Sequence, residues 1–315
     1  MDGRKTFSHF PELPPELRMM MVDKMETEDR CRFSGSSKLS NKEAKSSKNY
    51  IHSLELHLHD FDKKVVVIHG KTNQGFTLRF SKKMGKQYMR CMSMRNRQLW
   101  MTNLEEFINL EHFAFLRFKN LLQCYQRTIK TLTVVVLRAT KEFEDAHLGI
   151  SCLNNLKELC VTNDIDSRKF LSRTRRCLNS LTVHGRRNCR LLENCEQIFQ
   201  VKKKLSIPYT QLNSEQFLRI SASCVIIHIG QLTENDIFNF VQSWRNETLR
   251  KEMESYEWRL EGSNFKVRKL FEFFGEDHDG VSGKAIRVKH IVKKEKSAML
   301  VFDCCGVLSF FEDLE

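Results

Sequence analysis

The side chains best suited to bind a metal ion lie in one short segment of the chain. His52, His57 and His59 are followed by Asp60, and imidazole and carboxylate groups are common zinc ligands. His57 and His59 are two residues apart, so in a β-strand they share one face. The same spacing is expected of the polar side of a strand whose other side is apolar from Leu54 onward. We favour this second interpretation and predict no metal site.

The cysteines and other reactive residues form no pattern that is typical of catalysis. Eleven cysteines are scattered singly apart from Cys304 and Cys305, without the Cys-x-x-Cys spacing of zinc or redox motifs. The sequence contains no nucleophile elbow and no phosphate-binding Gly-x-x-x-x-Gly-Lys loop. Residues 275–280 lack the alternating carboxylates of a calcium loop. We therefore predict a non-enzymatic chain with no catalytic residue, metal or cofactor.

Positive charge is concentrated in one part of the chain. The net charge is +13, and the segment from Arg168 to Lys204 has eleven Lys/Arg against Glu193 and Glu196. This basic run predicts one of three things: a solvated outer face, an acidic or phosphorylated partner, or nucleic acid. Its two aromatic residues fall on apolar helix positions, which argues against stacking on bases. The candidate substrate-binding residues are six arginines of this run: Arg173, Arg175, Arg176, Arg186, Arg187 and Arg190.

Composition favours a folded intracellular protein. The chain has 315 residues, of which 41% are hydrophobic, enough for a small module and a larger domain with a sizeable core. Residues 1–9 lack the apolar stretch of a signal peptide. No run approaches the ~18–20 apolar residues of a membrane span. Reduced cysteines suit the cytoplasm or the nucleus, and we expect no membrane partner.

A small helical module is predicted at residues 8–47. Leu13-Pro14-Pro15-Glu16 is typical of the first turn of a helix, where proline is tolerated. Leu17, Met20, Met21 and Met25 follow at helical spacing. Asp29 is suited to cap a second short helix. A module of this size buries too little apolar surface to fold well alone.

The next segment, residues 48–126, is predicted to be rich in β-structure and to end in a helix. Leu54, Leu56 and Leu58 alternate with polar residues, which indicates a half-buried strand. Two more strands are expected at Val65–Ile68 and Phe76–Phe80, on either side of a turn. The helix is expected from Asn103 to about Gln126.

Residues 127–315 repeat a short motif in which apolar residues occupy the first, fourth and sixth positions. The middle apolar residue recurs at spacings of 27, 22, 24, 22 and 29 residues, close to the ~20–29 of a leucine-rich repeat. These middle positions are Leu132, Leu159, Leu181, Leu205, Ile227 and Tyr256. Because no such unit can bury its apolar face alone, neighbouring units are expected to stack. The predicted fold class is α/β: an irregular β/α solenoid after the helical module.

Helices are expected between the repeated strands, at about 170–178, 191–199, 237–244 and 267–274. The clearest follows a capping box of Thr233 and Asp236. Stacking would bring arginines late in the first helix beside those that follow the next strand. At the C-terminus, Ala285–Val288 and Met299–Phe302 are expected to form a hairpin that caps the open end of the stack.

Both ends of the chain resemble one known family. The segment from Phe10 to Arg30, which contains the Leu13-Pro14 opening, resembles the F-box. Residues 232–244, with Asp236, Phe240 and Trp244, look like the signature of the type-2 F-box-associated domain, and residues 280–286 are similar to its closing motif. The resemblance implies a non-catalytic receptor that binds a Skp-type adaptor, through it a cullin, and a substrate protein awaiting ubiquitin. The adaptor-binding residues that it implies are Leu13, Pro14, Leu17, Met21, Val22 and Met25.

Two alternatives remain beside the F-box receptor. Ser36 and Ser40 stand where F-boxes often have valine and an aromatic residue, and Gly35 weakens the local helix. These departures favour a stand-alone repeat scaffold whose F-box no longer engages the adaptor. The second alternative is a basic module that binds nucleic acid, which rests on charge alone.

Overall fold

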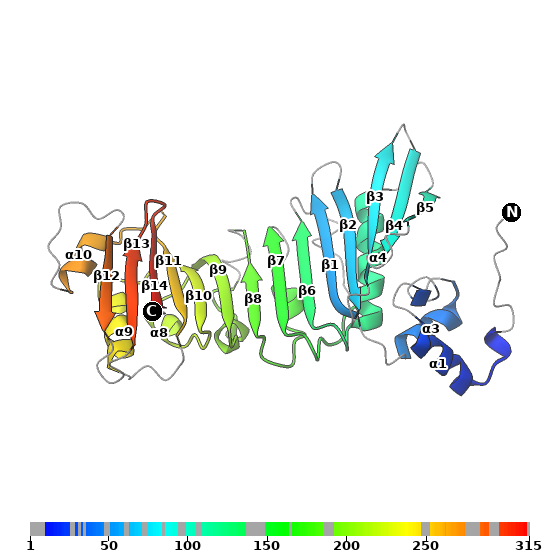
Figure 1. Ribbon diagram of the computed structural model, residues 1–315, viewed down its shortest axis with the longest axis horizontal. Coiled ribbons are helices and arrows are strands. Elements are labelled where there is room, and N and C mark those ends of the chain that lie inside the picture. The colour runs from blue at the N-terminus through cyan, green and yellow to red at the C-terminus, as the bar shows by residue number, and fades with distance from the viewer. Residues whose placement is uncertain are drawn as a thin grey trace. The chain divides into compact units, whose positions relative to one another are not determined.

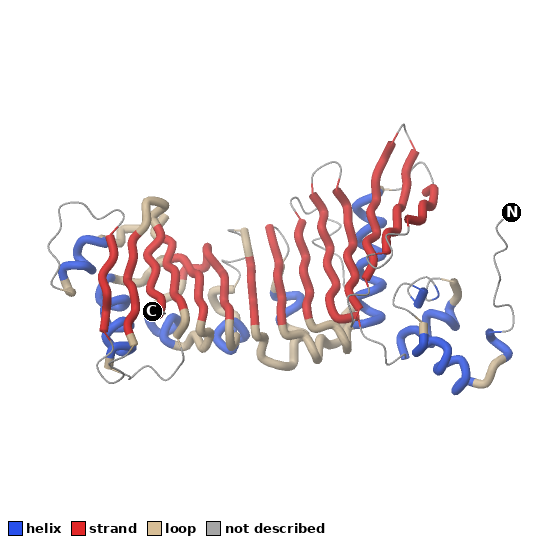
Figure 2. The backbone as a smooth tube through the Cα atoms, in the orientation of Figure 1, coloured by secondary structure: helices blue, strands red, loops and turns tan. Residues whose placement is uncertain are grey.

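The protein is an α/β protein that consists of two compact units in the computed structural model (Figures 1 and 2). The first unit contains Met1–Leu156 and Arg173–Arg175, and the second contains Lys157–Ser172 and Arg176–Glu315. The predicted boundaries near residues 47 and 126 both fall inside the first unit and stay predictions. The structure describes residues 10–25, 29–30, 33, 36–46, 51–59, 63–70, 75–83, 86–93, 99–104, 109–136, 149–163, 166–185, 192–246, 253–261, 263–274, 284–289 and 296–313.

The first unit begins with short helices and continues as a sheet. Its helices are η1 (Phe10–Glu12), α1 (Pro15–Lys24), α3 (Lys38–Ser46) and α4 (Leu110–Tyr125). Its strands are β1 (Ile51–His59), β2 (Lys63–Gly70), β3 (Gly75–Lys83), β4 (Lys86–Ser93), β5 (Leu99–Leu104) and β6 (Thr131–Val136). They lie in the order β6-β1-β2-β3-β4-β5. The β1–β6 pair is parallel and the others are antiparallel, because only a few residues of the sequence separate each strand from the next between β1 and β5.

One face of this sheet is covered by α4. The helix contacts β1, β2 and β3, and the predicted alternation is confirmed because Leu54, Leu56 and Leu58 are buried on the covered face. The helix begins at Leu110 and not at Asn103, since residues 99–104 form strand β5. Asn109 caps it, accepting hydrogen bonds from the N–H groups of Glu111 and His112.

The second unit contains a run of parallel strands in chain order. These are β7 (Glu158–Asn163), β8 (Ser180–Val183), β9 (Lys204–Gln211), β10 (Cys224–His228) and β11 (Ser255–Arg259). Every predicted middle position is buried in a strand. In β10 the predicted register is wrong by two residues, because Val225, and not Ile227, pairs with Leu205 and Tyr256.

The C-terminal part adds three antiparallel strands, not two. They are β12 (Lys284–Lys289), β13 (Ser297–Phe302) and β14 (Val307–Asp313). The predicted β12–β13 pair is present, but β14 was missed and lies between β13 and β11. The last parallel strand is therefore paired by β14 directly, and the expected hairpin lies beyond it.

The helices of the second unit are mostly shorter than the sequence predicts. They are α6 (Arg168–Leu171), η2 (Glu196–Gln200), α8 (Ser214–Leu218), α9 (Glu234–Arg245) and α10 (Val267–Glu272). Only α9 has the full predicted length, with its capping box formed. Helices α8 and α9 pack on the sheet through rings: Phe217 lies 6.2 Å from Trp258, and Phe240 lies 4.6 Å from Tyr256, between ring centroids. In the described part of the chain, no helix has the length and apolar character needed to span a membrane.

Candidate functional site

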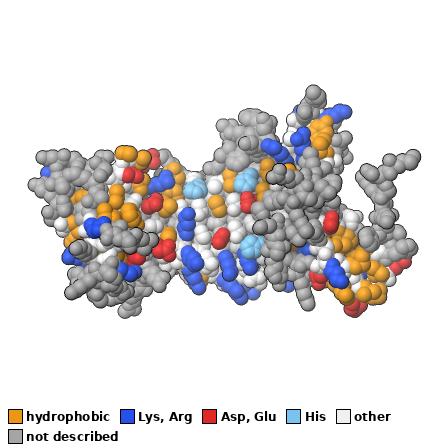
Figure 3. All heavy atoms as spheres, viewed as in Figure 1, with side chains coloured by type: hydrophobic (Ala, Val, Ile, Leu, Met, Phe, Trp, Pro, Cys, Tyr) orange, Lys and Arg blue, Asp and Glu red, His pale blue; other side chains and the backbone are white. Residues whose placement is uncertain are grey.

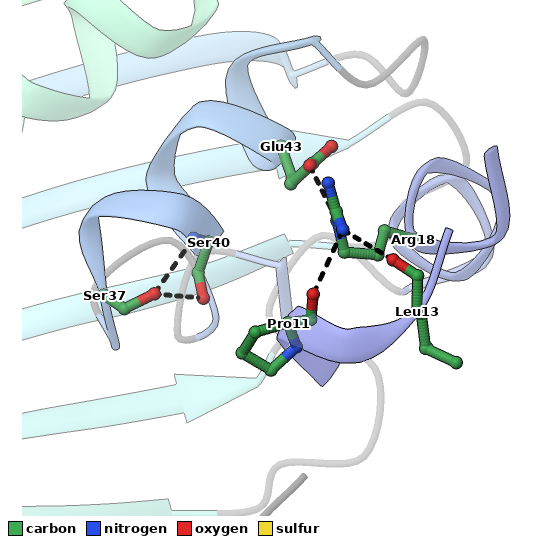
Figure 4. A network of polar contacts seen from close by, with 6 residues as sticks. All are labelled: Pro11, Leu13, Arg18, Ser37, Ser40 and Glu43. Atoms are coloured by element: carbon green, nitrogen blue, oxygen red, sulfur yellow. Dashed lines mark hydrogen bonds and ion pairs between the residues drawn. The ribbon is translucent and has the colours of Figure 1, made fainter. Parts of the chain in front are cut away.

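Polar contacts centred on Arg18 join the two helices of the N-terminal module (Figure 4). The Nε of Arg18 on α1 lies 3.0 Å from Oε1 of Glu43 on α3, and both side chains are largely buried. Its Nη1 also donates to the carbonyl oxygens of Leu13 and Pro11, at 2.5 and 3.3 Å. One guanidinium thus holds α1, the segment that precedes it and α3 together, using several of its five donors.

Two other buried polar side chains of the module, Arg30 and Ser40, also have hydrogen-bond partners within it. The guanidinium of Arg30 is buried and donates from Nη2 to the carbonyl oxygen of Met25, at 2.7 Å. Ser40 is also buried, and its hydroxyl lies 2.8 Å from that of Ser37 (Figure 4). It also lies 3.0 Å from the hydroxyl of Ser36. The serine at a position where apolar residues are common in F-boxes is therefore satisfied by local hydrogen bonds.

The six residues that the F-box resemblance selects differ in accessibility. Pro14 is exposed and Leu17 is 47% exposed, while Leu13, Met21 and Met25 are half-buried. Val22 is fully buried, so its side chain belongs to the interior of the module and offers a partner no surface. Met20 shares the helical spacing but is not selected by the resemblance, and it is the most exposed of the large apolar side chains of α1, at 54%.

Leu17 and Met20 form one exposed apolar stripe, because residues three apart share a helix face. We call these two residues the α1 stripe. Spacing includes Met20 in the apolar pattern, but because Met19 and Met21 stand on either side of it, spacing alone does not tell which side of the helix is exposed. Apolar side chains of this size on a short exposed helix suit contact with another protein and carry no reactive group.

The described candidate substrate-binding arginines do not lie on a helix. Helix α6 ends at Leu171, so Arg173 lies in the turn that follows it, and Arg175 and Arg176 lie in the irregular segment before β8. Arg173 is half-buried, and its Nε donates to the carbonyl oxygen of Ile150 at 3.0 Å. Arg175 and Arg176 are exposed. The predicted partners of these arginines, Arg186, Arg187 and Arg190, lie outside the described residues, so the predicted merged patch stays a prediction.

Other cations of the run have local partners or stand at a strand end. Arg168 forms an ion pair with Asp166, with Nε and Oδ1 3.0 Å apart. Burial opposes ionisation of Asp166, but the hydrogen bonds and charge of Arg168 outweigh it, so the pKa of this carboxyl lies below its ordinary value. Lys202, Lys203 and Lys204 are exposed where β9 begins.

The histidine segment is a strand, as the favoured interpretation predicts. His57 lies on the uncovered face of β1, and its Nε2 is 2.9 Å from Oε2 of Glu55. Among the described residues, no group of three His, Cys, Asp or Glu side chains could hold a metal ion. Burial raises the pKa of the thiols of Cys195 and Cys224, which disfavours the reactive thiolate.

The motif of residues 232–244 has a structural role. Asp236 accepts hydrogen bonds from the N–H and hydroxyl of Thr233, both at 2.7 Å. Burial opposes ionisation of Asp236, but these hydrogen bonds prevail and its pKa is lowered. Trp244 is buried, with its ring 5.3 Å from that of Phe310 on β14. These residues start α9 and fix it to the sheet.

Comparison with known proteins gives no match: no family model, no curated protein and no solved structure is significantly similar to the chain.

Proposed function

We propose that the protein is an F-box substrate receptor, which binds a Skp-type adaptor through its N-terminal module and a target protein through the rest of the chain. The observation that carries the proposal is the α1 stripe. Leu17 and Met20 project from a helix that is already held by α3 through its other side, so their exposure does not come from an unfinished core. Exposed apolar side chains beside a Leu-Pro helix start suit an adaptor contact.

The second unit supports the other half of the proposal. Parallel strands in chain order, covered by helices on one face, are the arrangement expected of an irregular leucine-rich-repeat-like solenoid. Such a sheet leaves its other face without helices. The exposed Arg175, in the first unit, and Arg176, in the second, remain candidates for an acidic or phosphorylated target.

The adaptor half is tested by a pull-down of a purified Skp-type adaptor with the full chain. Leu17→Asp combined with Met20→Asp places two carboxylates in the apolar contact and should abolish binding. Lys24→Glu is the matched control: it changes the net charge equally at an exposed position of the same helix, and it should bind as the wild type does. Leu13→Ala with Pro14→Ala, which removes the helix start, should also lose binding.

The outcomes separate the alternatives. Loss of binding in the double aspartate variant, with unchanged thermal melting, supports the proposal. Binding that survives this variant would show that the α1 stripe is not the adaptor surface. A wild-type chain that binds no adaptor would favour the stand-alone scaffold.

A further inference from the structure

The longest stretch without acidic residues lies in the first unit, not in the basic run. Residues 63–104 contain ten Lys/Arg and no Asp or Glu. They are Lys63, Lys64, Lys71, Arg79, Lys82, Lys83, Lys86, Arg90, Arg95 and Arg97. This stretch forms β2 to β5, an antiparallel meander whose positive charge has no acidic residue within its own sequence.

Register divides the meander into two faces with different roles. On the covered face, Phe80 is buried and its ring lies 5.7 Å from that of Phe113 on α4. On the uncovered face, Arg79 pairs with Arg90 across β3 and β4, and Arg90 pairs with Met101 across β4 and β5. Directly paired residues point to the same side of a sheet, so two arginines and a methionine form one row across three strands.

The uncovered face is apolar as well as basic. Met92 is 45% exposed and Met101 is 52% exposed. Figure 3 shows hydrophobic side chains flanked by Lys and Arg over the region where Figure 1 labels β3 and β4. The Nε of Arg90 is buried and has no hydrogen-bond partner among the described residues. A buried donor without a partner is costly, so this nitrogen of Arg90 has a hydrogen-bonding capacity that the described residues do not use.

Strand β5 ends the sheet of the first unit among the described strands. Its residues, Leu-Trp-Met-Thr-Asn-Leu, include no charge and no proline. Exposed edges are usually protected against pairing by lysine, proline or a bulge. An edge strand without those features, beside a basic meander, is suited to accept another strand.

We propose that the β5 edge binds an extended acidic segment of a partner protein as an additional strand. Backbone hydrogen bonds to β5 hold the segment, and alternate carboxylates lie on the side of Arg90 and Arg79. Neighbouring strands are about 4.8 Å apart, so Arg90 lies two strand spacings from the added strand and reaches it across Met101. The α1 stripe takes no part, so this proposal and the adaptor proposal can fail separately.

The chemistry favours a peptide over a nucleic acid. Single-stranded nucleic acids are bound by exposed aromatic rings that alternate with basic residues. Among the described side chains of β3 to β5, only one ring, that of the half-buried Tyr88, lies on the uncovered face. Methionines and a strand edge are better suited to an extended peptide, whose backbone can pair with β5.

The test uses the full chain and a defined probe, the fluorescein-labelled peptide Glu-Val-Glu-Val-Glu-Val-Glu, in fluorescence anisotropy. It should bind, and the same peptide with lysine for glutamate should not. A peptide with proline for the central valine keeps the charge but loses a backbone donor, and it should bind about tenfold more weakly. Binding should weaken as salt screens the charges.

Two protein variants locate the site. Arg79→Glu with Arg90→Glu should weaken binding by about tenfold or more, because two attractions become repulsions. Arg127→Glu with Lys130→Glu makes the same change in charge at exposed positions that follow α4 and should leave the affinity within about twofold. Melting curves check that both variants fold. If the first variant does not fold, the proline peptide on wild-type protein decides the proposal.

Several outcomes would overturn the proposal. An affinity unchanged by Arg79→Glu with Arg90→Glu would show that the peptide does not bind at this site. Equal binding of the proline peptide would show that the peptide does not pair with β5 as a strand. An oligo-uridine strand that binds more tightly than the peptide, and loses binding in the same variant, would make this a nucleic-acid surface. Concentration-dependent dimers that dissociate on Met101→Lys would assign the edge to a second copy of the chain.

Discussion

The N-terminal module and the second unit place their apolar and polar residues in opposite ways. In the module, Arg18 and Glu43 form a largely buried ion pair, while Leu17 and Met20 are exposed. In the second unit, the largest apolar side chains are buried together: Phe217, Phe240, Trp244, Tyr256, Trp258 and Phe310. Burial of apolar area is the main stabilising contribution to a fold. The second unit uses its apolar residues for stability, and the module leaves part of them for recognition.

The largest expected effect comes from the ring cluster of the second unit. Trp258 is fully buried and lies 5.9 Å from both Phe240 and Tyr256, between ring centroids. Trp258→Ala should lower the free energy of unfolding by about 3–5 kcal/mol, because it leaves a cavity. Chemical denaturation followed by circular dichroism measures this. Leu218→Ala, at an exposed position of α8, is the control and should change stability by less than about 0.5 kcal/mol.

A smaller effect is expected from the buried ion pair of the module. Arg18→Met keeps the length of the side chain but leaves Glu43 without this partner. The cost should be about 1–3 kcal/mol, the penalty for leaving a buried polar group unsatisfied. The hydrogen-exchange rates of the α1 and α3 amides should rise, while those of the β7–β11 amides stay unchanged. Arg18→Met with Glu43→Gln should recover part of the loss, and a double variant no better than the single one would contradict a coupled pair.

Loss of the α9 cap should lower the free energy of unfolding somewhat less than loss of the Arg18–Glu43 pair. The Thr233 hydroxyl accepts a hydrogen bond from the N–H of Asp236 at 3.3 Å, and the Asp236 carboxylate accepts one from the N–H of Thr233 at 2.7 Å. Thr233→Ala should destabilise the second unit by about 0.5–2 kcal/mol. Thr233→Ser keeps the hydroxyl and should restore most of the stability in thermal melts. Equal melting of the alanine and serine variants would contradict the capping role.

The same cap predicts a pH dependence. The pKa of Asp236 is lowered from its ordinary value of 3.8 in the folded state. The ionised Asp236 carboxylate therefore contributes its full stabilisation of the folded state above pH 3.8, and this stabilisation is lost as the pH falls through the lower folded-state pKa. The melting temperatures of wild type and Asp236→Asn should differ by a constant amount from pH 7 to 5 and converge below about pH 4. A constant difference down to pH 2 would contradict the lowered pKa.

The smallest effect on stability is expected at the α1 stripe. Leu17→Ala with Met20→Ala removes exposed apolar surface, so the melting curve should shift by no more than about 0.5 kcal/mol. Val22→Ala, on the same helix and fully buried, should destabilise the module more, although it removes fewer atoms. A larger loss of stability in the stripe variant than in Val22→Ala would show that the stripe, and not Val22, contributes more to the fold of the module.

Local patterns in the sequence predicted the elements that are held by local interactions. Helix α9 was predicted with its cap, because Thr233, Asp236 and the apolar residues that follow all lie within twelve residues. The strands of the parallel run were predicted because each has an apolar alternation of its own. Strand β4 was missed because Lys-Gln-Tyr-Met-Arg-Cys-Met-Ser has methionine on both faces, so Met92 on the exposed side conceals the alternation.

Features that depend on distant partners were not predictable in the same way. Strand β14 pairs with β11, which is about fifty residues earlier, and no local signal gives that register. Helix α6 was predicted too long because Thr174 and Leu178 continue the helical spacing, whereas Leu178 is buried two residues before β8 begins. For the site, the F-box resemblance selected Leu17 but also Val22, since spacing alone does not tell which side of α1 faces α3. The acid-free stretch 63–104 could have been found by counting charges along the whole chain.

The position of β14 has a consequence for the order of folding during synthesis. The chain leaves β11, forms α10, passes to β12 at the far edge, and returns through β13 before β14 pairs with β11. Until the ribosome releases residues 307–313, β11 has an open edge and Phe310 is missing from the rings around Trp244. A nascent chain at this stage exposes an unpaired strand and aromatic surface, the features that chaperones bind and that promote aggregation. The second unit therefore completes its sheet only late in synthesis. A frameshift or stop codon shortly before residue 307 would produce a chain that is recognised as unfolded.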